Sequence, residues 1–81
     1  MMSKENSMGT PVRNLQEMLR VINFYEELLP EVIVDGIYDD KTKEAVINFQ
    51  KRFDLPPTGV VDIITFEKIV EEYVKIVDVK G

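Results

Sequence analysis

A short pattern that occurs twice constrains the fold of this 81-residue chain more than any other feature. The two copies read DGIYDDKT (residues 35–42) and TGVVDIIT (residues 58–65), so the second begins 23 positions after the first. Each copy contains a glycine turn, two residues of extended character, and an aspartate three residues before a threonine. The repetition predicts one local structure, used twice.

The aspartates of the repeat are predicted to start helices. Aspartate is a preferred N-cap, because its carboxylate accepts from a backbone amide that has no partner within the helix. We expect Asp39 to accept from the amide of Thr42 or of its neighbour, and Asp62 to act in the same way before Thr65. Gly36 precedes the first cap and is free to take a positive φ.

Apolar residues at helical spacing follow each repeat, and a third such segment precedes both. The first helix is expected over residues 11–29, with Thr10 as its N-cap, Pro11 at its first position and Pro30 at its end. The expected core-facing residues are Val12, Leu15, Met18, Leu19, Ile22 in the first helix, Thr42, Ala45, Val46, Phe49, Phe53 in the second, and Phe66, Ile69, Val70, Tyr73, Val77 in the third.

These patterns predict an all-α fold, a small three-helix bundle with two similar units of glycine turn and capped helix. A chain of this length forms one small domain. We expect residues 1–9 to be a flexible N-terminal leader, residues 10–77 the helical domain, and residues 78–81 a C-terminal tail that frays or extends.

The composition argues against catalysis. The chain has no cysteine and no histidine, which are common nucleophiles, general bases and metal ligands. The segment after Asp35 is a poor calcium loop, because Ile37 and Lys41 stand at alternate positions where oxygen ligands are needed. We therefore expect no catalytic residue, no metal and no cofactor.

Charge and hydropathy limit the partners. The net charge is −5, and the ten basic residues form no stripe, so we expect no nucleic-acid partner. No apolar run approaches the roughly 20 residues that span a bilayer, and the N-terminal residues do not resemble a secretory signal.

Tyrosines near the expected helix ends and turns are candidate ligand contacts. Tyr25 and Tyr38 can present a ring to a sugar or a peptide, or they can simply close the small core. Both interpretations stay open on the sequence alone.

The segments VRNLQEML and DGIYDDKTKEAVINFQKRFDLPPTGVVDIITFEKI together resemble the peptidoglycan-binding domain of the three-helix type, which is appended to bacterial cell-wall hydrolases. The resemblance covers about residues 12–72 and joins three separated segments in the right order. The residues that match the family pattern are Leu15, Gln16, Asp35, Gly36, Thr42, Ala45, Val46, Phe49, Gln50, Gly59, Val61, Thr65 and Phe66.

The resemblance implies a non-catalytic module that recognises glycan strand or stem peptide and tethers an associated protein or domain, such as a hydrolase, to the wall. It also implies a place in the cell envelope or outside the cell. If the native protein acts there, its export signal lies outside this chain, and the 81 residues can be a whole small protein or a fragment of a larger one. Most of the matching residues, with the caps Asp39 and Asp62, are expected to build the scaffold. Arg13, Tyr25 and Tyr38 are the expected ligand contacts at its rim.

Three departures from the family pattern bear on this interpretation. Asp39 replaces a glycine, Phe66 replaces a tryptophan, and the connection NFYEELLPEVIV (residues 23–34) is longer than the common version. The longer connection alters the rim where a ligand would lie. The alternative interpretation is a protein-interaction or interdomain packing module that has the same fold and no wall ligand.

Overall fold

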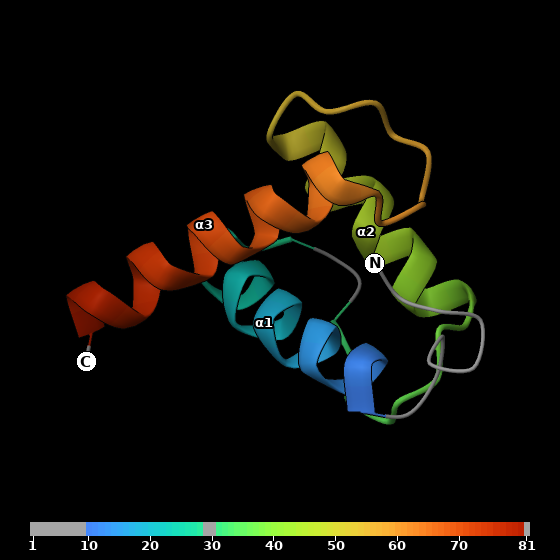
Figure 1. The fold of residues 1–81 in the computed structure, drawn as a ribbon, viewed down its shortest axis with the longest axis horizontal. Helices are drawn as coiled ribbons and strands as arrows, with labels where there is room; N and C mark the ends of the chain where they lie inside the picture. Colours follow the sequence, from blue (N-terminus) through green and yellow to red (C-terminus); the bar gives the residue numbers. More distant parts are fainter. Residues whose placement is uncertain (1–9, 29–30, 81) are drawn as a thin grey trace.

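The computed structural model describes residues 10–28 and 31–80, and within these residues the chain forms three α-helices and no strand. The helices are α1 (Thr10–Glu26), α2 (Asp40–Arg52) and α3 (Ile63–Lys80). α1 packs chiefly against α3 and to a smaller extent against α2. In Figure 1, α2 lies to the right of α1, and the last turns of α3 extend to the left beyond it. The predicted all-α three-helix architecture is confirmed.

Both predicted aspartate caps are present. The Asp39 carboxylate accepts from the Thr42 amide at 3.0 Å, and the Asp62 carboxylate accepts from the Thr65 amide at 2.8 Å. Each bond satisfies a backbone donor that has no partner in its own helix, and such a cap is worth about 1 kcal/mol. The cap expected of Thr10 lies outside the described side chains.

The turn glycines take the left-handed conformation that only glycine adopts at low cost. Gly36 has φ 79° and Gly59 has φ 77°. A Cβ atom at Gly59 would lie 2.8 Å from Cγ of Lys43 and 3.2 Å from Cγ1 of Ile47. Space as well as backbone conformation therefore requires glycine at the second turn.

α1 ends earlier than predicted, at Glu26 and not near residue 29. Glu27 has φ 56°, and the Leu28 amide donates to the Asn23 carbonyl oxygen at 2.9 Å. This is the Schellman arrangement, in which a left-handed residue closes the last helical turn.

The end of α2 repeats this geometry. Asp54 has φ 61°, and the Leu55 amide donates to the Gln50 carbonyl oxygen at 2.7 Å. Both helices thus end with an acidic residue where glycine is the usual choice.

α3 continues to Lys80, so the expectation of a frayed or extended chain at residues 78–80 is wrong. No glycine or proline interrupts the segment between residues 63 and 80. The exposed Lys75 ammonium also lies 3.8 Å from Glu71 and 3.2 Å from Glu72, which are favourable helical spacings. The division into leader, domain and tail remains a prediction, and residues 1–9 lie outside the described part of the chain.

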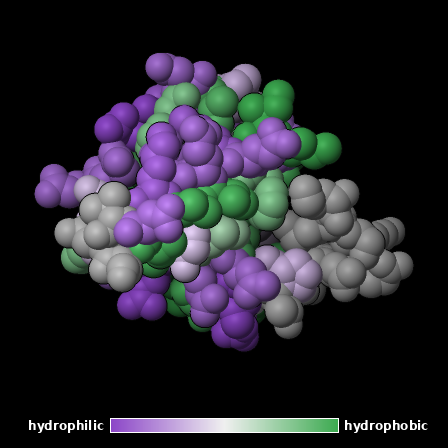
Figure 2. Space-filling view, turned by 60° about the vertical axis from the view of Figure 1, so that its left-hand side comes forward, coloured by the Kyte–Doolittle hydropathy of each residue, from purple (hydrophilic) through white to green (hydrophobic). Residues whose placement is uncertain are grey.

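The core consists of one apolar cluster between the helices. Its buried members are Leu15, Leu19, Ile22, Val32, Ala45, Val46, Phe49 and Ile69. Partly buried side chains, Phe66 and Tyr38 among them, pack around it. Figure 2 shows that apolar atoms also reach the surface in several separate groups, bordered by polar atoms.

Candidate functional site

Two buried glutamines hold the two turns of the repeat. The first, Gln16 on α1, donates from Nε2 to Asp35 Oδ1 at 3.1 Å, to the Ile37 carbonyl oxygen at 2.9 Å and to Thr42 Oγ1 at 3.0 Å. Its Oε1 accepts from the amides of Asp35 at 3.1 Å and Gly36 at 2.8 Å. One side chain thus joins α1, the first turn and the start of α2.

Gln50 on α2 does the same for the second turn. Its Nε2 donates to Thr58 Oγ1 at 3.4 Å, to the Val60 carbonyl oxygen at 3.0 Å and to Thr65 Oγ1 at 3.1 Å. Its Oε1 accepts from the Gly59 amide at 2.9 Å. The repeat is therefore a repeat of side-chain contacts as well as of sequence, and these residues form the scaffold of the domain.

The Asp35 carboxylate is held in its charged form. The Ile37 amide donates to it at 2.9 Å, Gln16 donates to it as well, and the Arg13 guanidinium lies nearby. These three contacts, in that order of importance, lower the pKa of Asp35. Arg13, one of the expected ligand contacts, thus lies exposed on α1 beside the first turn.

Tyr38, another expected ligand contact, links the two turns. Its hydroxyl donates to the Gly59 carbonyl oxygen at 2.7 Å, and its ring packs against the core. Burial raises the pKa of Tyr38 to about 12, because the phenolate would lose its hydration. The hydroxyl of Tyr38 therefore belongs to the scaffold. From the sequence alone, a role was expected only for its ring.

Tyr25, the third expected contact, lies at the other end of α1. It stands 12 residues after Arg13, which corresponds to about 18 Å along a helix. The structure therefore places Arg13 and Tyr38 around the first turn and separates Tyr25 from them. Tyr25 is 46% exposed and makes an edge-to-face contact with Phe24, their ring centroids 5.3 Å apart.

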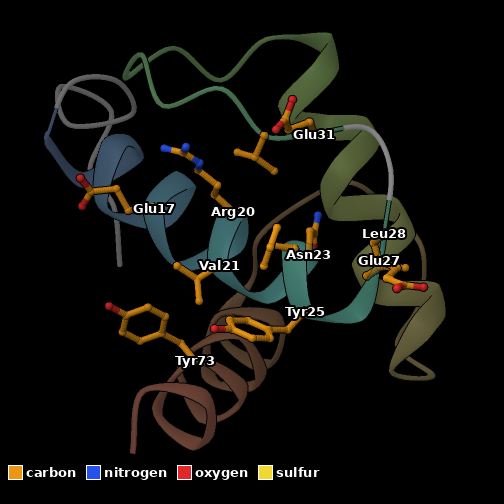
Figure 3. Close-up of a pocket in the computed structure, with 11 residues that line it drawn as sticks. Glu17, Arg20, Val21, Asn23, Tyr25, Glu27, Leu28, Glu31 and Tyr73 are labelled. Atoms are coloured by element: carbon orange, nitrogen blue, oxygen red, sulfur yellow. The ribbon is translucent and has the colours of Figure 1, made fainter. Parts of the chain in front are cut away.

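Tyr25 lines a pocket of about 930 Å³ beside the C-terminal half of α1, the segment that follows it, and α3. Its wall is partly aromatic and aliphatic, with Tyr73 supplied by α3 and Val21 by α1. In the view of Figure 3, the labelled side chains of Tyr25 and Tyr73 lie at the lower end and Glu31 at the upper end. A largely apolar concavity of this volume is of the size that holds small ligands.

Asn23 is the unusual member of this pocket. The side chain is 3% exposed, and neither its Oδ1 nor its Nδ2 has a hydrogen-bond partner among residues 10–28 and 31–80. Leaving a buried polar atom unpaired costs about 1–3 kcal/mol, so native structures rarely do so without a reason. Sequence reasoning missed this residue, because only the tertiary arrangement buries it.

The charges around the pocket are predominantly acidic. Glu17, Glu27 and Glu31 are exposed at its rim, and Arg20 is the one basic residue among the described residues that line it. Figure 3 shows these four side chains around the pocket, with Asn23 on α1 near the middle of the view. The arrangement offers hydrogen bonds, aromatic faces and charge for binding.

The described residues hold no group of three or more acidic, histidine or cysteine side chains placed to bind a metal ion. Within the same part of the chain, no helix is long and apolar enough to cross a membrane.

Comparison with known proteins points to one family. A family model described as "Putative peptidoglycan binding domain" matches residues 8–69, more than half of the chain. No curated protein and no solved structure matches the chain. The matched region contains both glutamines, both turns and most of the pocket-lining residues.

Proposed function

The chain belongs to the peptidoglycan-binding domain family, and from this premise we propose that it is a non-catalytic module that tethers an associated protein or domain to the bacterial cell wall. The family match over residues 8–69 is the observation that carries the proposal. The three-helix fold supports the proposal, and so do the hydrogen bonds of Gln16 and Gln50 to the two turns, because both glutamines and both turns lie within the matched region.

The tether acts through effective concentration. A module that holds its partner at the wall turns the partner's encounter with the polymer into an intramolecular event, so a weak site is enough. A cell-wall hydrolase is the partner that this mechanism serves best, and the cell envelope is the place where it operates. The absence of histidine and cysteine from the chain supports a binding role over a catalytic one.

Among the three expected contacts, Tyr25 is the best placed for a ligand. Its ring is about half exposed and lines the pocket, whereas the ring of Tyr38 packs against the core. We assign Arg13 and Tyr38 to a secondary contact surface at the first turn. There, the guanidinium can pair with a stem-peptide carboxylate.

Co-sedimentation with insoluble peptidoglycan, freed of teichoic acids, tests the proposal. We expect the wild-type domain to be retained in the pellet and Tyr25→Ala to be retained less. Ile64→Ala, which changes an exposed apolar residue on α3 outside the pocket, serves as the control and should behave like the wild type. A wild-type domain that stays in the supernatant at high wall concentration would contradict tethering and favour a protein partner.

A further inference from the structure

Resting on the proposed function, we propose that the pocket beside α1 and α3 is the capture site and that it takes a peptide segment that carries a backbone amide and, at the end of an alkyl side chain, a primary ammonium. Stem peptides of peptidoglycan that contain a diamino acid offer this combination. The N-acetyl groups of the glycan strand share the amide and lack the ammonium.

The amide part of the proposal comes from Asn23. Its carboxamide is buried and carries one acceptor oxygen and one donor NH₂ group, both unpaired within the described residues. A ligand amide supplies the complement, because its carbonyl accepts from Nδ2 and its N–H donates to Oδ1. Binding would thus give partners to two buried atoms that lack them, and a ligand without polar groups would leave them unpaired.

The ammonium part comes from the charges. Among the described residues that line the pocket, three carry a carboxylate, Glu17, Glu27 and Glu31, and one carries a guanidinium, Arg20. Across residues 10–28 and 31–80, no ion pair engages any of these four groups. An excess of negative charge at the mouth of an apolar pocket raises the local concentration of cationic ligands. Arg20 remains available for a carboxylate of the same peptide.

The aromatic wall suits the same ligand. Tyr25 and Tyr73 line the pocket with rings that can pack against the alkyl chain of a diamino acid. An ammonium near the face of such a ring gains a further cation–π attraction. Amide, alkyl chain and ammonium each find a complementary group within one pocket.

The test uses three soluble probes added to the ¹⁵N-labelled domain. They are the tripeptide N-acetyl-L-Ala–γ-D-Glu–L-Lys, in which the lysine ε-amine is the one free amine, the same peptide with that amine also acetylated, and a chitin tetrasaccharide as the glycan arm. We expect the free-amine peptide to shift the Asn23 side-chain signals and the backbone signals of Tyr25 and Tyr73, and to bind at least about fivefold more tightly than the acetylated peptide. Shifts that lie outside the pocket, or equal binding of the tetrasaccharide, would overturn the assignment.

Two variants separate recognition from folding. Asn23→Leu should weaken the free-amine peptide about tenfold while raising the midpoint of thermal unfolding by about 4 °C or more, because it removes unpaired buried atoms. If Asn23 had a purely structural role, Asn23→Leu would instead lower the midpoint of thermal unfolding. Glu31→Gln, at an exposed position, should keep the fold and reduce the preference for the free amine. Asn14→Leu, exposed on the same helix outside the pocket, should change neither affinity nor preference.

The failures of the two proposals are distinguishable. If the wall retains the domain and Asn23→Leu leaves both retention and peptide binding unchanged, tethering stands and the pocket assignment falls. If the peptide binds in an Asn23-dependent way and the wall does not retain the domain, the pocket assignment stands and tethering falls.

Discussion

Individual polar side chains hold this small domain together. Gln16 is buried, and its carboxamide is the common partner of the first turn and of Thr42 at the start of α2. Gln50 has the same position relative to the second turn. Because a buried donor that loses its partner costs more than an ordinary hydrogen bond contributes, these two residues carry an unusual share of the stability.

Replacing Gln16 tests this directly. Gln16→Leu is of similar size and leaves the amides of Asp35 and Gly36 without their acceptor, so we expect a loss of about 3 kcal/mol in the free energy of unfolding. For a domain of this length that is a large share of a total of roughly 4–12 kcal/mol. Urea denaturation measures the loss, with Asn14→Leu, at an exposed position on the same helix, expected within about 0.5 kcal/mol of the wild type. An unchanged midpoint for Gln16→Leu would show that the turn is held by other contacts.

The two turn and cap aspartates give stability a defined dependence on pH. The Ile37 amide is the main cause that lowers the pKa of Asp35, and the Thr65 amide is the main cause that lowers the pKa of Asp62. A carboxyl group with a lowered pKa in the folded state binds fewer protons there than in the unfolded chain. Its stabilising contribution is therefore present above the unfolded value, 3.8, and is lost as the pH falls through the folded value.

We expect thermal unfolding midpoints to be nearly constant from pH 7 to about pH 5 and to fall below about pH 4. Asp62→Asn should lower the midpoint at pH 7 and flatten the acid limb, because the amide still caps the helix and no longer titrates. Differential scanning calorimetry across this range provides the measurement. If the acid limbs of Asp62→Asn and Asp35→Asn are both as steep as that of the wild type, other carboxyl groups control the acid response.

At the scale of elements, the caps and turns could be predicted and the helix ends could not. The spacing of Asp39 and Thr42 places the capping carboxylate and the amide that donates to it within four residues, so a local pattern is enough to predict the cap. The end of α1 depends instead on a left-handed Glu27, a residue type with no preference for that conformation. A local pattern gives no sign of it.

The same locality explains what the sequence revealed of the site. Gln16 was expected to be structural from the resemblance, yet its partners lie 19 to 26 positions away, beyond the reach of any spacing argument. The sequence around Asn23 gives no sign that its side chain is buried. The burial results from the packing of α1 with the rest of the chain. Resemblance therefore predicted the scaffold well, whereas the pocket required the three-dimensional structure.

Two left-handed positions, Gly59 in the second turn and Asp54 at the end of α2, are expected to respond in opposite ways to substitution. Gly59→Ala should lose about 2 kcal/mol or more, because alanine would take a positive φ and its Cβ would meet Lys43. Asp54→Gly should gain about 0.5–1 kcal/mol, because glycine relieves the left-handed strain at the end of α2. Chemical denaturation of both variants beside the wild type compares the two. A Gly59→Ala variant as stable as the wild type would contradict the close packing of the second turn on α2.

At the scale of the whole molecule, the fold separates structure from recognition. The two turns and their glutamines lie between α1, α2 and the start of α3, where they fix the arrangement of the helices. The pocket lies beside the C-terminal half of α1, where α3 supplies Tyr73 and the segment after α1 supplies Glu31. Leu28, Glu31 and Val32, which belong to the long connection that distinguishes this chain from the family pattern, thus form part of the pocket wall. A module built in this way can vary its ligand contacts and keep its scaffold.

The most direct test of the central claim is a binding isotherm on purified insoluble peptidoglycan for the wild type, Asn23→Leu and Asn14→Leu. We predict saturable binding of the wild type and of Asn14→Leu with the same dissociation constant, and binding about tenfold weaker for Asn23→Leu, whose fold is at least as stable. Equal isotherms for all three proteins would contradict capture through the pocket. The absence of saturable binding by the wild type would contradict the assignment of this chain as a wall tether.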